Sequence, residues 1–220
     1  MIEGELITRN PFGLPSLAWR EGRFSRRDAT TMTHDGDPSG PVTVTLPPDL
    51  LAAVPKRRSE FLAGRICAAL ALREAGLPET VTRAGRAPIW PAGAAGSISH
   101  TDTRVVAAVS RDLAGLGVDC EDIMSERQAH ELRAMIVTPA EAAQRPAALP
   151  FPAFLTLVFS AKEALYKALS HRLDRILEFH DVTVTGLSPD RLHLSQGGLP
   201  YDALYRLDGA GCLTLVRVPR

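Results

Sequence analysis

Two carboxylates in the segment GVDCE have a spacing that suits a divalent-cation site. Asp119 and Glu121 stand two residues apart in a pattern typical of a strand, so both side chains leave the same face while Cys120 points to the other. Like charges this close repel, and a hard divalent cation bound through oxygen would relieve the repulsion. An exposed strand end, with water around both groups, is the alternative that the spacing leaves open.

A helical segment, FSAKEALYKA, adds a third carboxylate. Glu163 and Lys167 are spaced i, i+4, so they could simply stabilise each other on the helix surface by about 0.2–0.5 kcal/mol. The apolar stripe of the same helix leaves both near the polar side, where we expect Lys162 to flank them. The helix can therefore present one carboxylate and two ammonium groups together.

Basic side chains gather on a second predicted helix, at about residues 55–75. Arg58 and Arg65 lie two helical turns apart and share a face, with Arg57 at its edge. Because 25 basic and 25 acidic side chains cancel, no general field draws the chain to nucleic acid or to an anionic membrane, and any anion must be bound locally. A solvated basic face is the alternative.

Ser99 and His100 end a predicted strand that follows a Gly- and Pro-rich loop at 85–96. Ser99 lacks the GxSxG elbow, and neighbouring residues of a strand point to opposite faces, so a Ser-His-Asp hydrolase is not supported. Hydrogen bonding to a phosphate fits the pair better.

The elements that position these groups are predicted from periodicity and turn residues. Residues 1–40 are rich in Gly, Pro, Thr and Asp, and we expect irregular structure there. The uneven grouping of strands and helices favours an α+β fold over a doubly wound parallel sheet. The other expected elements are a strand at 42–46, an antiparallel meander of strands at 96–101, 104–110 and 116–121, helices at 125–136, from 138 and at 152–171, and strands in the remainder.

The bulk composition sets the outer limits. The 220 residues, 45% of them hydrophobic, suffice for one large domain or two halves. Neither a secretory leader nor an apolar run of about 18 residues is visible, so we expect a cytoplasmic location. Cys67, Cys120 and Cys212 are far apart and are expected to be buried and reduced.

Five segments together resemble the phosphopantetheinyl transferases of the surfactin and enterobactin type, in the order and spacing of that family. They are KRRSEFLAGR (56–65), APIWP (87–91), GSISH (96–100), GVDCE (117–121) and FSAKEALYKA (159–168). The resemblance runs from about Val42 to Ser170. It implies a pseudo-twofold arrangement of two similar α+β halves, residues 1–113 and 114–220, with coenzyme A in the cleft between them.

The resemblance also implies the chemistry of the acidic groups. Asp119, Glu121 and Glu163 would hold Mg²⁺, with Mn²⁺ as an alternative, against the pyrophosphate of coenzyme A. Glu163 would be the general base that takes the proton from the acceptor serine. Lys167 would stabilise charge on the departing 3′,5′-ADP.

Basic and polar residues are assigned by the same resemblance to the rest of coenzyme A. The assignments are Arg57 or Arg58 with Arg65 at the 3′-phosphate and adenine, Arg86 and the 85–88 backbone at the nucleotide, His100 with Ser99 at a phosphate, and Lys162 beside the phosphates.

The implied acceptor is a serine of an apo acyl or peptidyl carrier protein, in siderophore, other nonribosomal peptide or polyketide synthesis. We expect a monomer without nucleic-acid or membrane partners. Two alternatives stay open. One is a Mg²⁺ enzyme that hydrolyses coenzyme A or a nucleotide, and the other is a non-catalytic carrier-binding protein of the same fold.

Overall fold

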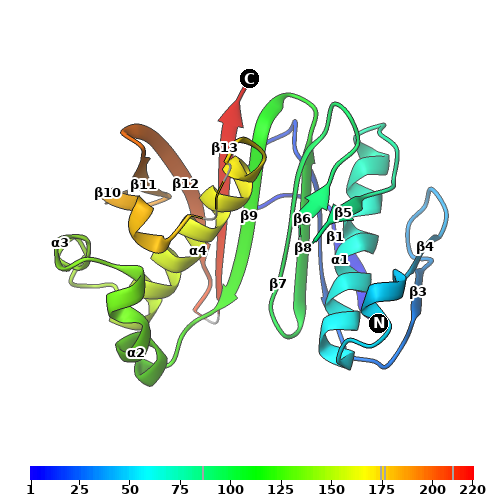
Figure 1. Cartoon of the computed structure of the whole chain (residues 1–220), viewed down its shortest axis with the longest axis horizontal. Coiled ribbons are helices and arrows are strands. Elements are labelled where there is room, and N and C mark those ends of the chain that lie inside the picture. The colour runs from blue at the N-terminus through cyan, green and yellow to red at the C-terminus, as the bar shows by residue number, and fades with distance from the viewer. Residues whose placement is uncertain (86, 174, 176, 210) are drawn as a thin grey trace. The chain divides into compact units, whose positions relative to one another are not determined.

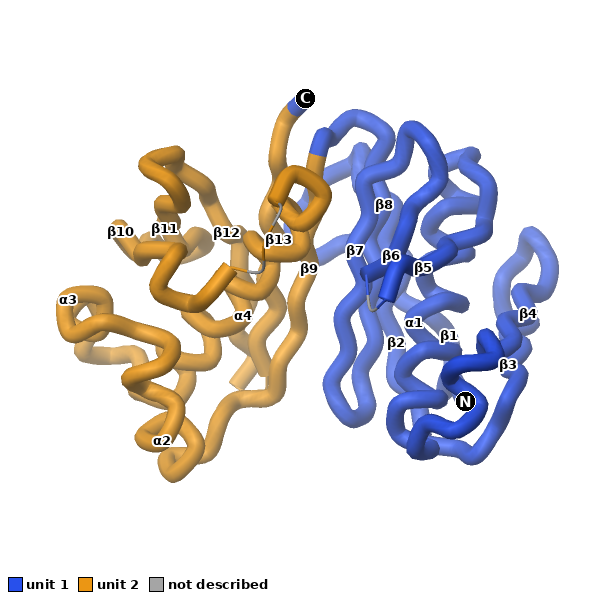
Figure 2. The backbone as a smooth tube through the Cα atoms, viewed as in Figure 1, with its two compact units in different colours: residues 1–114, 220 blue, residues 115–219 orange. Residues whose placement is uncertain are grey.

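The computed structural model describes residues 1–85, 87–173, 175, 177–209 and 211–220. Contacts within the chain divide it into two compact units, residues 1–114 with Arg220 and residues 115–219 (Figure 2). Each unit combines helix with antiparallel sheet (Figure 1), which confirms the predicted α+β class.

The first unit packs one long helix, α1, against a four-stranded antiparallel sheet in the order β1-β2-β8-β7. The buried side of α1, with Leu62, Ile66 and Leu70, meets Phe24 and Val105 in one apolar core. Its elements are β1 (Ile2–Ile7), β2 (Ala18–Phe24), β3 (Thr31–His34), β4 (Val42–Thr45), α1 (Pro55–Glu74), β5 (Thr82–Ala84), β6 (Ala87–Ile89), β7 (Ala95–His100) and β8 (Arg104–Ser110).

The N-terminal segment departs from its prediction. Residues 1–40 were expected to be irregular, and this is wrong, because they contain β1, β2 and β3, with β2 between β1 and β8 in the sheet. The strand carries Arg20, Glu21 and Arg23, and charged residues at alternate and adjacent positions hide the apolar period on which strand prediction depends.

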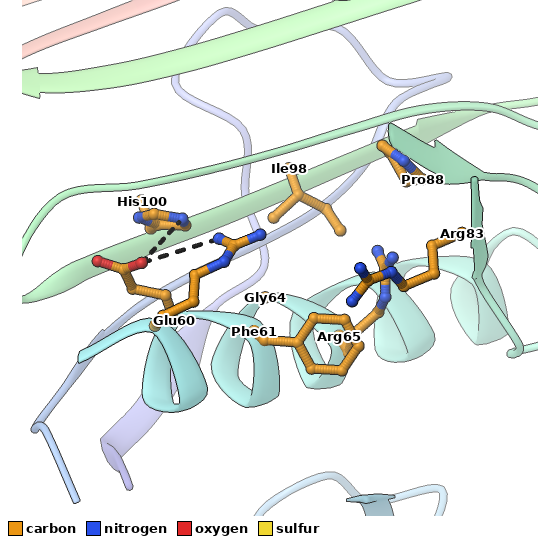
Figure 3. Close-up of a pocket in the computed structure, with 9 residues that line it drawn as sticks. Glu60, Phe61, Gly64, Arg65, Arg83, Pro88, Ile98 and His100 are labelled. Carbon is orange, nitrogen blue, oxygen red and sulfur yellow. Dashed lines mark ion pairs between the residues drawn. The ribbon is translucent and has the colours of Figure 1, made fainter. Parts of the chain in front are cut away.

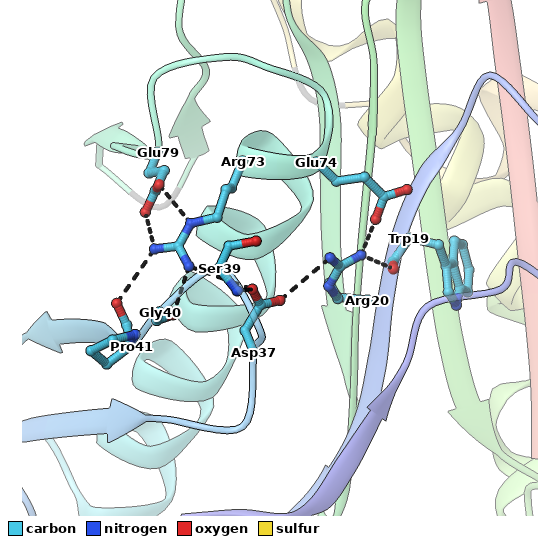
Figure 4. A network of polar contacts seen from close by, with 9 residues as sticks. All are labelled: Trp19, Arg20, Asp37, Ser39, Gly40, Pro41, Arg73, Glu74 and Glu79. Carbon is cyan, nitrogen blue, oxygen red and sulfur yellow. Dashed lines mark hydrogen bonds and ion pairs between the residues drawn. The ribbon is translucent and has the colours of Figure 1, made fainter.

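A network of ion pairs makes the buried charge of Arg20 tolerable (Figure 4). Arg20 is 7% exposed and pairs with Glu74 at the end of α1, and its guanidinium lies 3.6 Å from Asp37. Arg73 joins the network 3.6 Å from Asp37 and 2.7 Å from Glu79. A buried charge needs such partners, and here they fix the N-terminal segment to the last turn of α1.

The second unit packs α4 against a sheet in the order β10-β11-β12-β13-β9, with α2 against the helix. The helices and strands predicted after residue 124 are confirmed, including the capping boxes that open α2 at Ser125 and α3 at Thr138. Its elements are β9 (Leu113–Asp122), α2 (Glu126–Ile136), α3 (Pro139–Ala142), α4 (Phe151–Leu169), β10 (Val182–Ser188), β11 (Arg191–Gln196), β12 (Leu199–Leu207) and β13 (Gly211–Pro219).

Two predictions about the middle of the chain are wrong. The meander ends after β7 and β8, because β9 joins the second sheet beside β13. The turn residues between β8 and β9 do not distinguish a chain that folds back into the same sheet from one that passes to another sheet. The supposed loop at 85–96 contains β6, which pairs with β5 in a small hairpin whose Gly85 adopts φ 58°.

Other expectations hold. The strand at 42–46 and the helix at 55–75 are confirmed as β4 and α1. Cys67, Cys120 and Cys212 are buried, and no disulfide joins them in the described part of the chain. Burial raises the pKa of Cys67 to about 12. Among the described residues we find no helix with the length and apolar character that a membrane crossing requires.

Candidate functional site

Two glycines let β9, which carries the strand carboxylates, approach α4 closely. A Cβ on Gly117 of β9 would lie 1.8 Å from the carbonyl oxygen of Ala164 in α4, and one on Gly115 would lie 2.2 Å from that of Ala168. No other residue type allows β9 to cross α4 this closely. The crossing sets Asp119 and Glu121 beside the polar side of α4.

We call Asp119, Glu121, Glu163 and Lys167 the carboxylate cluster. Lys167 Nζ donates to Asp119 Oδ1 at 2.6 Å and to the carbonyl oxygen of Val118 at 3.2 Å. Burial would lower the pKa of Lys167, but the Asp119 carboxylate outweighs it and the pKa is raised. Lys167 therefore forms hydrogen bonds to β9, in addition to the i, i+4 pairing with Glu163 that its spacing suggested.

The cluster holds more negative than positive charge. Burial, and then repulsion from Asp119, raises the pKa of Glu121 to about 8. Burial also raises the pKa of Glu163, with Lys167 opposing and Asp119 adding to the shift. Oxygen donors that repel one another in this way fit a hard divalent cation by their chemistry. In the described part of the chain, no three His, Cys, Asp or Glu side chains already lie together as the ligands of one ion.

A second cluster lines a cavity of about 150 Å³ in the first unit, which we call the arginine cavity (Figure 3). This volume is roughly ten times the 10–15 Å³ or so that one water needs. The lining residues are Arg57, Glu60, Phe61, Gly64, Arg65, Arg83, Pro88, Ile98 and His100.

The helical part of this lining follows from spacing and from one glycine. Arg57, Phe61, Gly64 and Arg65 lie on one face of α1, at i, i+4, i+7 and i+8. A Cβ on Gly64 would lie 2.9 Å from Ile98 Cγ2, so glycine lets α1 approach β7 and its lining residues.

The lining of the cavity contains more basic than acidic side chains. Glu60 Oε2 lies 3.8 Å from both His100 Nε2 and Arg57 Nη1. Arg65 Nη2 donates to the carbonyl oxygen of Thr82 at 3.2 Å, and its guanidinium lies 5.0 Å from the ring centre of Phe61. Burial, with Arg83 and Arg57 nearby, lowers the pKa of Arg65 to about 10.

Some of the predicted nucleotide contacts do not meet at this cavity. Of the two alternatives on α1, Arg57 lines it, whereas Arg58 Nη2 lies 2.6 Å from Asp28 Oδ1. Ser99 is 6% exposed and lies on the face of β7 opposite His100, because neighbouring strand residues alternate between faces. The contact of both residues with one phosphate stays a prediction. Arg86 lies outside the described residues.

Lys162, which was predicted to stand beside the phosphates, lies in a buried ion pair. Its side chain is buried, and Nζ donates to Glu141 Oε1 at 2.9 Å and to the carbonyl oxygens of Ile136 at 2.8 Å and Phe179 at 2.9 Å. The residue sits one position before Glu163, and 100° of helical turn directs it into the packing between α4, α2 and α3. It is a structural ion pair.

Sequence reasoning missed several lining residues. Glu60, Phe61 and Gly64 follow Arg57 by three, four and seven residues, so helical spacing could have found them. Arg83 gives no such signal, because it lies on the three-residue strand β5.

Comparison with known proteins covers both units. Residues 48–110 match the model of the 4′-phosphopantetheinyl transferase N-terminal domain, and residues 115–214 match that of the 4′-phosphopantetheinyl transferase superfamily. Enterobactin synthase component D of Salmonella typhimurium is 45% identical over 148 residues, which are 66% of this chain and 62% of that protein.

Two further relatives extend the comparison. Enterobactin synthase component D of Escherichia coli K12 is 47% identical over 122 residues, which are 54% of this chain and 58% of that protein. The 4′-phosphopantetheinyl transferase PptT of Mycobacterium tuberculosis is 34% identical over 157 residues, 68% of this chain and 67% of that protein. The chain spans about three fifths of the length of the enterobactin relatives it matches.

Proposed function

The chain belongs to the 4′-phosphopantetheinyl transferase superfamily, in its enterobactin synthase component D type, and from this premise we propose its reaction. The protein transfers the 4′-phosphopantetheine group of coenzyme A to a serine hydroxyl of an apo carrier protein and releases 3′,5′-ADP. The observation that carries the proposal is the carboxylate cluster, which the Gly117 crossing assembles on α4.

Metal binding is assigned to the three acids of this cluster. Asp119, Glu121 and Glu163 would hold Mg²⁺, or Mn²⁺ in its place, because their oxygens are hard donors. Burial, with a contribution from the repulsion of Asp119, raises the pKa of Glu121 and of Glu163, and a cation would favour their charged forms. When bound, the ion would neutralise charge on the pyrophosphate of coenzyme A.

Glu163 is the proposed general base. It takes the proton from the serine hydroxyl, directly or through water, as that oxygen attacks the β-phosphorus and the bond to 3′,5′-ADP breaks. Burial raises the pKa of Glu163 towards the operating pH, which makes it a better proton acceptor than an ordinary surface carboxylate.

Lys167 is proposed to stabilise charge on the leaving group. Its contact with Asp119 at 2.6 Å holds the ammonium at the strand carboxylates, so a cation stands where the pyrophosphate would bring negative charge. Positioning and charge neutralisation dominate phosphoryl transfer, and no covalent enzyme nucleophile is needed.

The nucleotide end of coenzyme A is assigned to the arginine cavity. Arg57 and Arg65 supply guanidinium groups for the 3′-phosphate, since arginine forms paired hydrogen bonds to phosphate. Phe61, Pro88 and Ile98 give the apolar surface that an adenine ring needs, and His100 is proposed to contact a phosphate.

The acceptor is inferred from the relatives. Two of them are named enterobactin synthase component D, which favours carrier domains of siderophore or other nonribosomal peptide synthesis, with polyketide synthesis as the second choice. A monomeric enzyme in the cytoplasm, arranged as two pseudo-twofold halves with coenzyme A between them, stays a prediction.

Intact-mass spectrometry of an apo carrier tests the reaction. With Mg²⁺ and coenzyme A, we expect the carrier to gain one phosphopantetheine group on serine, and a carrier with that serine changed to alanine to gain none. No gain on several unrelated carriers, while coenzyme A disappears, would replace the transferase by a hydrolase. No gain and no loss of coenzyme A would favour a non-catalytic carrier-binding protein.

A further inference from the structure

The chain that carries the strand carboxylates is fixed to α4 at two places. Before the carboxylates, the main chain of β9 passes close to the helix at Gly115 and Gly117. After them, the backbone N–H of Met124 donates to the side-chain oxygen Oγ1 of Thr156 in α4, at 3.0 Å. Thr156 precedes the segment FSAKEALYKA, so no motif in the sequence points to this second contact.

Thr156 is fully buried, and its hydroxyl both donates and accepts. Oγ1 donates to the carbonyl oxygen of Pro152, one helical turn back, at 2.7 Å, and it accepts from the N–H of Met124. A threonine that bonds to the carbonyl oxygen of residue i−4 has a fixed χ1 angle. The oxygen of Thr156 is therefore held in place as the acceptor for Met124.

Glu121 lies near the end of an edge strand. Among the described strands, β9 has β13 as its one neighbour in the sheet. The strand ends at Asp122, and α2 begins at Glu126. Asp119 and Glu163 act on Glu121 as like charges. The end of β9 would therefore move away from α4 unless the residues that follow it are held.

The connection from β9 to α2 is held at two of its backbone N–H groups. Ser125 N donates to Gln128 Oε1 at 3.0 Å, within the capping box of α2. The capping box ties Ser125 to its own helix, whereas the bond from Met124 N ties the same connection to α4. Because Met124 follows Glu121 by three residues, this bond limits where the end of β9 lies relative to α4.

Thr156 and Glu163 share one face of α4, because they lie seven residues, or two helical turns, apart. The bond from Met124 therefore places the end of β9 on the helix face that presents Glu163. Ser160 lies between these two residues in α4, but its hydroxyl pairs with Thr214 Oγ1 of β13 at 2.9 Å. The two buried hydroxyls of α4 thus serve different strands.

We propose that Thr156 is a positioning residue, which holds the end of β9 through Met124 so that Glu121 and Glu163 can bind one divalent cation. This inference rests on the proposed function and adds to it a residue that acts through the main chain. It predicts that loss of the acceptor oxygen weakens metal binding although every metal ligand remains. Loss of the other buried hydroxyl of α4 should not have this effect.

Mn²⁺ binding measures the effect without turnover. Mn²⁺ is added to the protein with saturating coenzyme A and no carrier, and the free ion is measured by electron paramagnetic resonance. Thr156→Val keeps the shape of the side chain but removes the acceptor, and we expect its dissociation constant for Mn²⁺ to rise about tenfold, as for other groups that orient metal ligands. Thr156→Ser keeps the oxygen and should restore most of the affinity.

Ser160→Ala is the matched control. It removes a second fully buried hydroxyl from α4, while Thr214 Oγ1 still donates to the carbonyl oxygen of residue 160, at 3.0 Å. We expect a lowered melting temperature in both Ser160→Ala and Thr156→Val, but weaker Mn²⁺ binding in Thr156→Val alone. Equal weakening in the two folded variants would indicate a general loosening of α4 and overturn the inference.

Carrier modification separates this inference from the proposed function. In Thr156→Val, the Mg²⁺ concentration for half-maximal rate should rise about tenfold, while kcat at saturating Mg²⁺ and KM for coenzyme A change by less than about threefold, because the bound ion restores the positions of its ligands. An unchanged Mg²⁺ dependence, with the carrier modified, overturns the role of Thr156 and leaves the proposed function standing. Wild type that binds no Mn²⁺ beside coenzyme A also overturns it, whether or not a carrier is modified.

Discussion

The close approach of a helix to a strand has a different structural basis in the two units. Both need a glycine, but the Cβ missing from Gly64 would meet only Ile98 Cγ2 at 2.9 Å, whereas the one missing from Gly117 would meet the carbonyl oxygen of Ala164 at 1.8 Å. A side chain can turn away and a helix backbone cannot. The strand carboxylates are therefore positioned by the main chain itself, and the arginine cavity by adjustable side chains.

The side chains near the two helix–strand contacts also carry opposite charges. The first unit contains the guanidinium groups of Arg65 and Arg83, each with a buried nitrogen that has no hydrogen-bond partner among the described residues. The second contains Glu121 and Glu163, whose pKa values are raised. An anion satisfies the first and a divalent cation the second.

The largest effect is expected at the second unit's base. Glu163→Gln should lower kcat for carrier modification by about 10²–10⁴-fold, because the serine proton then has no acceptor, while affinity for coenzyme A changes little. Asp190→Asn, an exposed acid at the far turn between β10 and β11, is the control and should retain wild-type kcat. Near-normal turnover in Glu163→Gln would remove it from the base role.

The two lysines of α4 should separate in stability and in activity. Lys162→Met leaves Glu141 buried without its cation and should cost about 3–5 kcal/mol in the free energy of unfolding, measured with urea. Lys167→Met should lower the free energy of unfolding by less than Lys162→Met does, since the side chain of Lys167 is 28% exposed. It should lower kcat by more.

Removing the second charge is the control for that pair. Lys162→Met combined with Glu141→Gln should recover part of the lost stability, because no uncompensated charge remains. A stable Lys162→Met protein with a raised KM for coenzyme A would instead return Lys162 to the phosphates.

Adding one methyl group tests the glycine comparison directly. Gly117→Ala should destabilise the fold by about 3 kcal/mol, because the backbone of α4 must move. Gly64→Ala should change stability by less than about 1 kcal/mol, because alanine's higher helix propensity offsets the displacement of Ile98. Equal losses in the two variants, by calorimetric melting, would contradict the distinction between backbone and side-chain closure.

A pH profile gives the smallest effect. The folded pKa of Glu121, about 8, exceeds its unfolded value of 4.5, so the folded state binds the extra proton between them and stability falls as pH rises through about 8. In the presence of a metal chelator, the melting temperature should fall as the pH rises from about 5 to about 9. The fall should be smaller in Glu121→Gln. Mg²⁺ should raise it at the alkaline end; a flat wild-type profile would contradict this account of the cluster.

Much of the fold and the site could be predicted from local patterns. The capping residues at Ser125 and Thr138, the period of α1 and the alternation after residue 181 each specify an element within a few residues. The carboxylate pair follows from strand alternation at Asp119 and Glu121. These features depend on neighbours in the chain.

The features that local patterns did not predict depend on contacts between distant segments. Arg20 is compatible with a buried strand only because Glu74 and Asp37 stand opposite it, and no window of sequence contains all three. Lys162 could not be told from Lys167 without the position of Glu141. Arg83 belongs to the cavity only through the hairpin that brings β5 to α1.

The most direct test of the account follows both products of one reaction. In a time course with Mg²⁺, coenzyme A and an apo carrier, the account predicts one 3′,5′-ADP released for each carrier that gains phosphopantetheine, by mass spectrometry of nucleotide and protein together. Nucleotide released without modified carrier, on several unrelated carriers, would contradict it.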